Sequence, residues 1–187
     1  HQNLKDEKSL FNSIIVVTDR RVLNRQIQNS IRQFQQVPGS VVYVDEKQPS
    51  AVLASAIENG TPIIVTTLQR FPIISSTVAQ NKDKTYAVII DEAHSSQAGE
   101  SARHLRKALS LEEAELADGE EKSLDEIIAD EIKAKGDQAN ISFFAFTATP
   151  KPKTIELFGT IRSGQKEAFD LYTMEQAIKE GFIKDVL

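Results

Sequence analysis

Short apolar runs alternate with amphipathic stretches along this chain. Residues 13–18, Ser-Ile-Ile-Val-Val-Thr, form a continuous apolar run that ends in polar residues, which is typical of a strand buried on both faces. Similar runs predict further strands at 41–44, 63–67, 86–90 and 142–147. Because helical patterns separate the runs, the sequence predicts a parallel sheet with helices on both faces.

The amphipathic stretches predict the helices. Asp19 is placed to cap a helix that ends at Val37-Pro38-Gly39. Its inward face is expected to carry Leu23, Ile27, Ile31 and Phe34. A second helix is predicted at 50–59, ended by Gly60, with an inward face of Val52, Leu53, Ala56 and Ile57. Shorter helices are predicted at 102–109 and 174–179.

Residues 110–140 form an acidic segment with 11 acidic and 3 basic residues. Ser110 with Glu113 and Ser123 with Glu126 both have the spacing of a capping box, in which each side chain pairs with the other's end of the first helical turn. We interpret the segment as an acidic helical insertion between two strands; a disordered acidic loop is the alternative. The net charge of −5 becomes +3 outside this segment, which permits DNA binding without arguing for it.

The bulk composition sets further bounds. The 187 residues suit one globular domain or most of one. The absence of cysteine excludes disulfides and thiolate metal sites. The apolar runs are far shorter than a membrane span, and the charged N-terminus does not resemble a secretory signal. We therefore expect a soluble, cytoplasmic protein with no membrane partner.

The chemistry is predicted where two strands end. Asp91 and Glu92 follow the strand at 86–90, and in an open parallel sheet the active crevice lies beyond the carboxyl ends of the strands. One carboxylate there suits Mg²⁺ held partly through water, and the other suits polarisation of a water that attacks a phosphate. Helix capping by the Asp-Glu pair is the alternative. Thr147 and Thr149 end the strand at 142–147, where turn chemistry is the alternative role.

Five stretches in order resemble a known family. Asp91-Glu92-Ala93-His94, followed by Thr147-Ala-Thr149, is similar to motifs II and III of superfamily 2 helicases. The chain more closely resembles the restriction (R) subunit of type I restriction-modification enzymes. That likeness rests on residues 91–97, 142–151 and 172–183, with 16–20 and 64–71 similar to motifs Ia and Ib.

The resemblance implies a three-layer RecA-like (P-loop NTPase) α/β domain, and it implies roles for individual residues. Asp91 would coordinate Mg²⁺ and Glu92 would activate water. His94, Thr147 and Thr149 would couple nucleotide state to DNA grip. The residues along the DNA backbone would be Thr18, Arg20, Thr66, Thr67 and Gln69. The implied cofactors are ATP and Mg²⁺, and the implied partners are double-stranded DNA and the methyltransferase and specificity subunits.

A phosphate-binding loop, Gly-x-x-x-x-Gly-Lys-Ser/Thr, is missing from this sequence, because none of its eight glycines precedes a lysine. In the family this loop precedes motif Ia, so we read residues 1–187 as a motor domain 1 that is incomplete at its N-terminus. Residues 160–187 are read as an extension toward a second motor domain. We expect this polypeptide alone to lack ATPase and nuclease activity, and we expect exposed strand edges that favour self-association.

Two other functions fit the same sequence. Another superfamily 2 helicase, acting on RNA or on repair intermediates, shares the expected fold. A non-catalytic interaction module, with the acidic segment binding a partner, belongs to a different class. Deletion of residues 110–140 separates the last from the first two, because a motor domain keeps its DNA contacts without the segment.

Overall fold

The computed structural model describes residues 4–5, 8–18, 31, 37–45, 47–91, 128, 139–147, 150 and 152–184. The chain forms two compact units, His1–Thr149 and Pro150–Leu187. The predicted helices at 19–37 and 102–109 and the acidic segment 110–140 lie outside the described residues, except for a few positions. Among these, Ile31 and Ile128 are helical, and Ile128 is buried.

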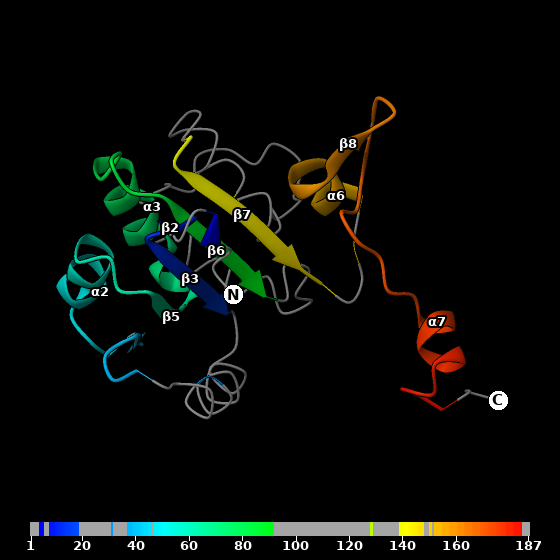
Figure 1. Ribbon diagram of the computed structural model, residues 1–187, viewed down its shortest axis with the longest axis horizontal. Helices are drawn as coiled ribbons and strands as arrows, with labels where there is room; N and C mark the ends of the chain where they lie inside the picture. Colours follow the sequence, from blue (N-terminus) through cyan, green and yellow to red (C-terminus); the bar gives the residue numbers. More distant parts are fainter. Residues whose placement is uncertain are drawn as a thin grey trace, which may run out of the picture. The chain divides into compact units, whose positions relative to one another are not determined.

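The first unit is built on a five-stranded sheet with the order β4-β5-β3-β6-β7. All neighbouring strands in this sheet run parallel, and in Figure 1 the arrowheads of β3, β6 and β7 point the same way. The strands are β3 (Ser13–Thr18), β4 (Val41–Val44), β5 (Ile63–Thr67), β6 (Tyr86–Asp91) and β7 (Ile141–Phe146). The prediction of a parallel α/β sheet is confirmed. A two-stranded antiparallel ribbon, β1 (Leu4–Lys5) with β2 (Lys8–Ser9), precedes it.

Two helices pack on one face of the sheet. Helix α2 (Ser50–Glu58) follows β4, and helix α3 (Phe71–Gln80) follows β5 through a 3₁₀ turn, η1 (Leu68–Arg70). Phe71 of α3 lies against Phe143 of β7, with ring centroids 6.5 Å apart, and this contact identifies the face that α3 covers. The predicted inward face of α2 is confirmed for Leu53, Ala56 and Ile57 and wrong for Val52, which lies on the solvent side of the first turn.

The register of the sheet sorts the strand residues between its two faces. Side chains alternate along each strand, and residues paired across parallel strands point to the same side. Val17, Thr66 and Ile90 belong to the face covered by α3, in the row that includes Ala145 of β7. The next row, which ends the strands, points to the opposite face and contains Thr67, Thr18, Asp91 and Phe146.

Strand β7 pairs only with β6 among the strands that the structure describes. Its apolar sequence suits a strand with neighbours on both sides, yet Phe144 and Phe146 are 44% and 59% exposed. Phe11 covers part of this face through an edge-to-face contact with Phe144. Strands β4 and β7 are the two outer strands of the described sheet, and self-association through an exposed edge stays a prediction.

The second unit contains helix α6 (Pro152–Phe158), a hairpin of β8 (Thr160–Arg162) with β9 (Gln165–Glu167), and helix α7 (Met174–Lys179). Ser163 and Gly164 both have positive φ, 51° and 83°, as a two-residue hairpin turn requires. The predicted helix at 174–179 is confirmed. Its ends are defined by Thr173, which accepts a hydrogen bond from the Gln176 N–H, and by Gly181 at a φ of 75°.

The side chains around α7 interlock at the surface. The Tyr172 hydroxyl donates to Glu180 at 2.8 Å, and the Gln176 amide donates to the same carboxylate at 3.0 Å. These hydrogen bonds, the one from Gln176 first, lower the pKa of Glu180 below its ordinary value. The family-like stretch 172–183 is therefore a locally closed helical motif.

No helix in the described parts of the chain is long and apolar enough to cross a membrane.

Candidate nucleotide and nucleic-acid site at the carboxyl rim

Asp91 is the last residue of β6, an inner strand of the parallel sheet. The carboxyl ends of all five strands meet at one edge, which we call the carboxyl rim. Asp91 pairs in register with Phe146 of β7, so Thr147 is the next residue beyond this pair. The position predicted from sequence, a carboxylate at the rim where ligands bind in open α/β sheets, is therefore observed.

Two threonines extend the row of Asp91 across the sheet. Thr18 and Thr67 are register partners on β3 and β5. Val17 pairs with Ile90, so the following residues, Thr18 and Asp91, are neighbours too. With strands about 5 Å apart, the three side chains occupy one row on one face, about 10 Å from end to end. The structure thus places three residues that the sequence analysis selected on a single line.

The two threonine hydroxyls of this row have no hydrogen-bond partner among the described residues. Thr18 is fully buried and Thr67 is 2% exposed, yet within the part of the chain that the structure describes neither hydroxyl has a hydrogen-bond partner. The buried Oε1 of Gln69, two residues beyond Thr67, also has none. Unpaired buried polar groups each cost about 1–3 kcal/mol and are rare in native proteins. Three such atoms lie near one rim: two hydroxyls, which can donate or accept, and one amide oxygen, which can only accept.

Thr66 differs from Thr67 although the two are adjacent. Its side chain points to the face covered by α3, where its hydroxyl donates a 2.8 Å hydrogen bond to the Val44 carbonyl. Thr66 is fully buried, so this bond ties β5 to β4 inside the core. Alternation along the strand therefore gives one threonine an internal partner and leaves the other unpaired on the opposite face.

Arg70 organises the same rim and was not among the residues that the sequence analysis selected. Its guanidinium donates to Ser50 Oγ, Asp45 O and Gln48 O at 2.9, 3.1 and 2.5 Å. The partners are 20 to 25 residues away in the sequence: Asp45 and Gln48 lie between β4 and α2, and Ser50 is the first residue of α2. The signals in the sequence were its place directly after Gln69 at a strand exit and its inclusion in the stretch 64–71 that resembles motif Ib.

The remaining predicted residues lie outside what the structure describes. These are Arg20, Glu92, His94 and Thr149. Thr147 is described and partly buried, directly beyond β7. The roles of Asp91 and Thr147 in nucleotide coupling and of Glu92 as the water-activating group remain predictions.

The donor set at the rim fits one half of a magnesium–nucleotide site. Mg²⁺ is commonly bound through one or two carboxylates together with water and substrate phosphates, so Asp91 alone is a sufficient protein ligand. No group of three or more acidic or histidine side chains that could form an all-protein metal cage occurs among the described residues. The phosphates themselves need a cradle of backbone N–H groups, which this sequence does not provide as a glycine-lysine loop.

A parallel sheet with a carboxylate at its rim and unpaired hydroxyls beside it is compatible with the RecA-like motor domain of superfamily 2 helicases. The sequence model of the SWI2/SNF2 ATPase family matches residues 2–114, which is more than half of the chain and includes Thr18, Thr67 and Asp91. The chain belongs to the SWI2/SNF2 ATPase family. A comparison with curated proteins gave no match. Family membership supports a nucleic-acid-dependent ATPase motor domain that uses ATP.

Proposed function

We propose that this chain is part of the ATP-driven, double-stranded DNA-translocating motor of a type I restriction endonuclease R subunit. The observation that carries the proposal is the row of Thr67, Thr18 and Asp91 at the carboxyl rim. It joins the expected metal ligand to two unpaired hydroxyls. The five family-like stretches of the sequence favour the R subunit over other members of the superfamily.

In this proposal Asp91 holds Mg²⁺, and ATP supplies the free energy for movement along DNA. Glu92 orients the attacking water, while His94, Thr147 and Thr149 transmit the nucleotide state to the DNA-binding residues. Because the sequence lacks a phosphate-binding loop, turnover requires another polypeptide segment to supply that loop. The methyltransferase and specificity subunits are the proposed partners in the restriction complex.

The DNA contacts that we propose are Thr18, Arg20, Thr67 and Gln69. Thr66 is left out, since its hydroxyl already donates to Val44 O. Hydroxyl, amide and guanidinium groups at strand exits suit phosphate oxygens, which fix the position of a protein on DNA without reading its sequence. Gln69 is the partly exposed member, whereas Thr18 and Thr67 are buried, so phosphate reaches those two only when the rim opens.

A binding experiment tests this proposal. Fluorescence anisotropy compares duplex DNA with duplex RNA of the same sequence at several salt concentrations. We expect tighter binding to DNA, with affinity falling linearly on a double-logarithmic salt plot, because phosphate contacts release counterions. Gln69→Ala should weaken DNA binding about threefold to tenfold, the usual net value of one hydrogen bond.

The matched control is Gln80→Ala, which removes an exposed glutamine at the end of α3 and should leave binding unchanged. Preference for RNA would support another superfamily 2 helicase instead. Equal loss of DNA binding in both glutamine variants would remove the rim from the proposed contact surface.

A further inference from the structure

Arg70 joins two consecutive loops at the carboxyl rim. It ends the 3₁₀ turn η1, directly after Gln69 and three residues after Thr67. Both terminal nitrogens of its guanidinium donate to the segment that follows β4, Nη1 to Ser50 Oγ at the start of α2 and Nη2 to the carbonyls of Asp45 and Gln48 between β4 and α2. One side chain therefore fixes the β5–α3 turn against the preceding loop of the same rim.

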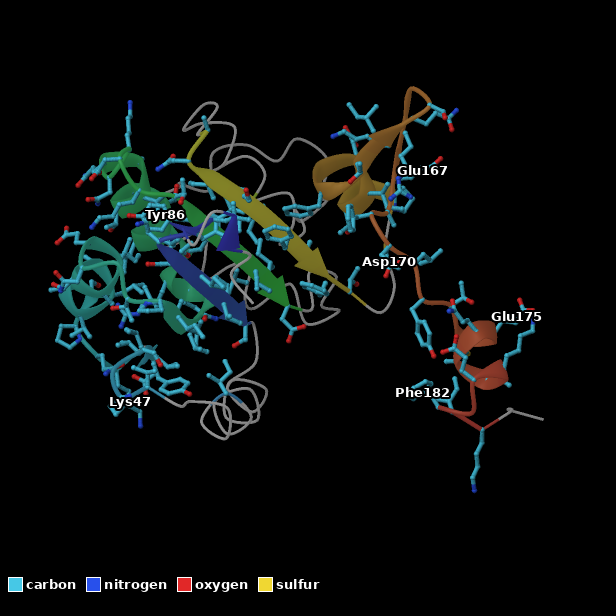
Figure 2. All side chains as sticks on the ribbon, viewed as in Figure 1. Lys47, Tyr86, Glu167, Asp170, Glu175 and Phe182 are labelled. Carbon is cyan, nitrogen blue, oxygen red and sulfur yellow. The ribbon has the colours of Figure 1, made fainter. Side chains whose placement is uncertain are left out.

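The loop that Arg70 grips is itself closed. The Asp45 N–H donates to Gln48 Oε1 at 2.9 Å, and the Lys47 N–H donates to Asp45 Oδ1 at 2.8 Å. Lys47, labelled in Figure 2, lies on this loop. These hydrogen bonds link Asp45, Lys47 and Gln48 to one another, next to the carbonyls that Arg70 binds.

The turn held by Arg70 contains the Thr67 hydroxyl, which has no partner among the described residues, and the side chain of Gln69. The hydroxyl and the amide N–H of Gln69 can donate to phosphate oxygens, whereas the buried Gln69 Oε1 can only accept. A side chain that is already fixed in position contributes more to ligand affinity, because less conformational entropy is lost upon binding. We propose that Arg70 is a positioning residue that holds Gln69 and Thr67 in the geometry for phosphate contact by tethering their turn to the β4–α2 loop. This inference rests on the proposed DNA-binding function of the rim.

A planar, forked guanidinium is required for this role, since a lysine ammonium cannot reproduce donors on two nitrogens toward separate acceptors. A residue that acted as a direct phosphate contact would behave differently. Lysine would then preserve most of the affinity, and loss of the charge would reduce the salt dependence of binding by about 0.9 in logarithmic slope.

The test measures duplex-DNA affinity against salt for Arg70→Lys, Arg70→Gln and Ser50→Ala. Tethering predicts that both Arg70 variants bind roughly tenfold more weakly, with an unchanged salt slope. Ser50→Ala, which removes a partner at the exposed start of α2, should lose about twofold to threefold. Adding Arg70→Lys to Gln69→Ala should cost little more than the stronger single change, because residues that act as a unit are non-additive.

Lys84→Gln is the matched control. Lys84 is also a cation that tethers two segments, through its ammonium to the Glu58 carbonyl, but it lies before β6 at the other end of the strands. Its loss should leave DNA affinity and salt slope unchanged. Affinity retained in Arg70→Lys, a reduced slope in Arg70→Gln, or additive losses with Gln69→Ala would each overturn the inference.

If the wild-type chain binds no duplex DNA, the proposed function is refuted, and the Arg70 tether needs a separate measurement. The tether is then judged by amide hydrogen exchange in Arg70→Gln. Faster exchange at Asp45 and Lys47, in the loop that carries none of the altered residues, supports the tether; unchanged exchange there overturns it.

Discussion

The two ends of the parallel strands differ in how their polar side chains are hydrogen-bonded. At the amino ends, side chains pair with the backbone of neighbouring segments. Asn12 and Thr85 exchange hydrogen bonds through both backbone and side chains, and the Asn140 amide donates to the carbonyls of Val78, Asn81 and Lys84. At the carboxyl ends, Thr18, Thr67 and Gln69 have buried polar atoms without partners in the described part of the chain. Both rims contain paired side chains, and the unpaired atoms at the carboxyl rim lie in or beside the row that contains Asp91.

This difference separates stability from function within a single sheet. Paired polar groups at the amino rim lower the free energy of the folded state, whereas unpaired groups at the carboxyl rim raise it. Such groups are commonly retained where a ligand completes their hydrogen bonds. Substitutions at the amino rim should therefore affect folding alone, and substitutions in the Thr18 row should affect binding first.

The largest effect is expected for Asn140→Ala. The Asn140 side-chain amide donates to carbonyls at the end of α3 and in the turn before β6. The Asn140 carbonyl also accepts from the Tyr86 N–H at the start of β6. Loss of the side chain leaves three carbonyls without this donor, which should lower the free energy of unfolding by about 2–3 kcal/mol. Thermal unfolding should then shift down by roughly 5–10 °C for a chain of this size.

Asn59→Ala is the control for this change, because Asn59 is an exposed asparagine at the end of α2. Its stability should change by less than about 0.5 kcal/mol. DNA affinity of the folded Asn140→Ala protein should match the wild type. Weaker binding by that variant, measured well below its unfolding temperature, would break the division between the two rims.

The second prediction compares the same substitution at two neighbouring threonines. Thr66→Val removes the 2.8 Å hydrogen bond to Val44 O and should destabilise the fold by about 1–2 kcal/mol without a direct effect on DNA affinity. Thr67→Val has nearly the same shape change but removes an unpaired hydroxyl. It should leave stability unchanged or slightly higher and weaken DNA binding about threefold to tenfold.

Each variant is the control for the other, since the substitution is identical and the positions are adjacent. Urea unfolding and DNA anisotropy are measured on both proteins. Equal destabilisation by the two changes would show that Thr67 has an internal role after all.

The strands of this sheet could be predicted from sequence, while helix α3 could not. Continuous runs of β-branched residues bounded by turn residues predicted β3, β4 and β5 within a residue. The segment of α3, Phe-Pro-Ile-Ile-Ser-Ser-Thr-Val-Ala-Gln, is poor in strong helix formers. Its helix depends on burial of Phe71, Ile74 and Val78, and Pro72 is tolerated because it lies in the first turn.

The residues of the candidate site could also be predicted from sequence only in part. The strand end located Asp91, because ligands of open parallel sheets bind beyond the carboxyl ends of the strands. Thr18 and Thr67 came from the family resemblance, and the parallel strands bring them to the same edge. Sequence pattern alone did not separate Thr66 from Thr67, although alternation along a strand assigns them to opposite faces. The tether from Arg70 depends on loops 20 or more residues apart, and only the folded chain brings these together.

Tyr86 and Ser13 are the exceptions at the amino rim. They are register partners on β6 and β3, both fully buried, and neither hydroxyl has a hydrogen-bond partner among the described residues. Tyr86, labelled in Figure 2, lies on the face covered by α3, where its pKa is raised above 10.0. Burial is the main cause, and the negative charges of Asp83 and Glu58 add to it.

The smallest effect is expected for Tyr86→Phe. This variant tests whether the unpaired Tyr86 hydroxyl contributes to ligand binding or only destabilises the fold. Removal of a buried unpaired hydroxyl should stabilise the protein by about 1 kcal/mol or less. Below pH 10.0 the tyrosine is neutral in both states. At higher pH the unfolded tyrosine ionises first, so its contribution to stability is lost as pH rises toward the raised pKa of the folded state. Unfolding from pH 8 to about 11 should therefore show a shallower decline for Tyr86→Phe than for the wild type. An unchanged slope would show that the pKa of Tyr86 is not raised in the folded state. DNA affinity that falls with the hydroxyl would place a ligand-binding position at the amino rim as well.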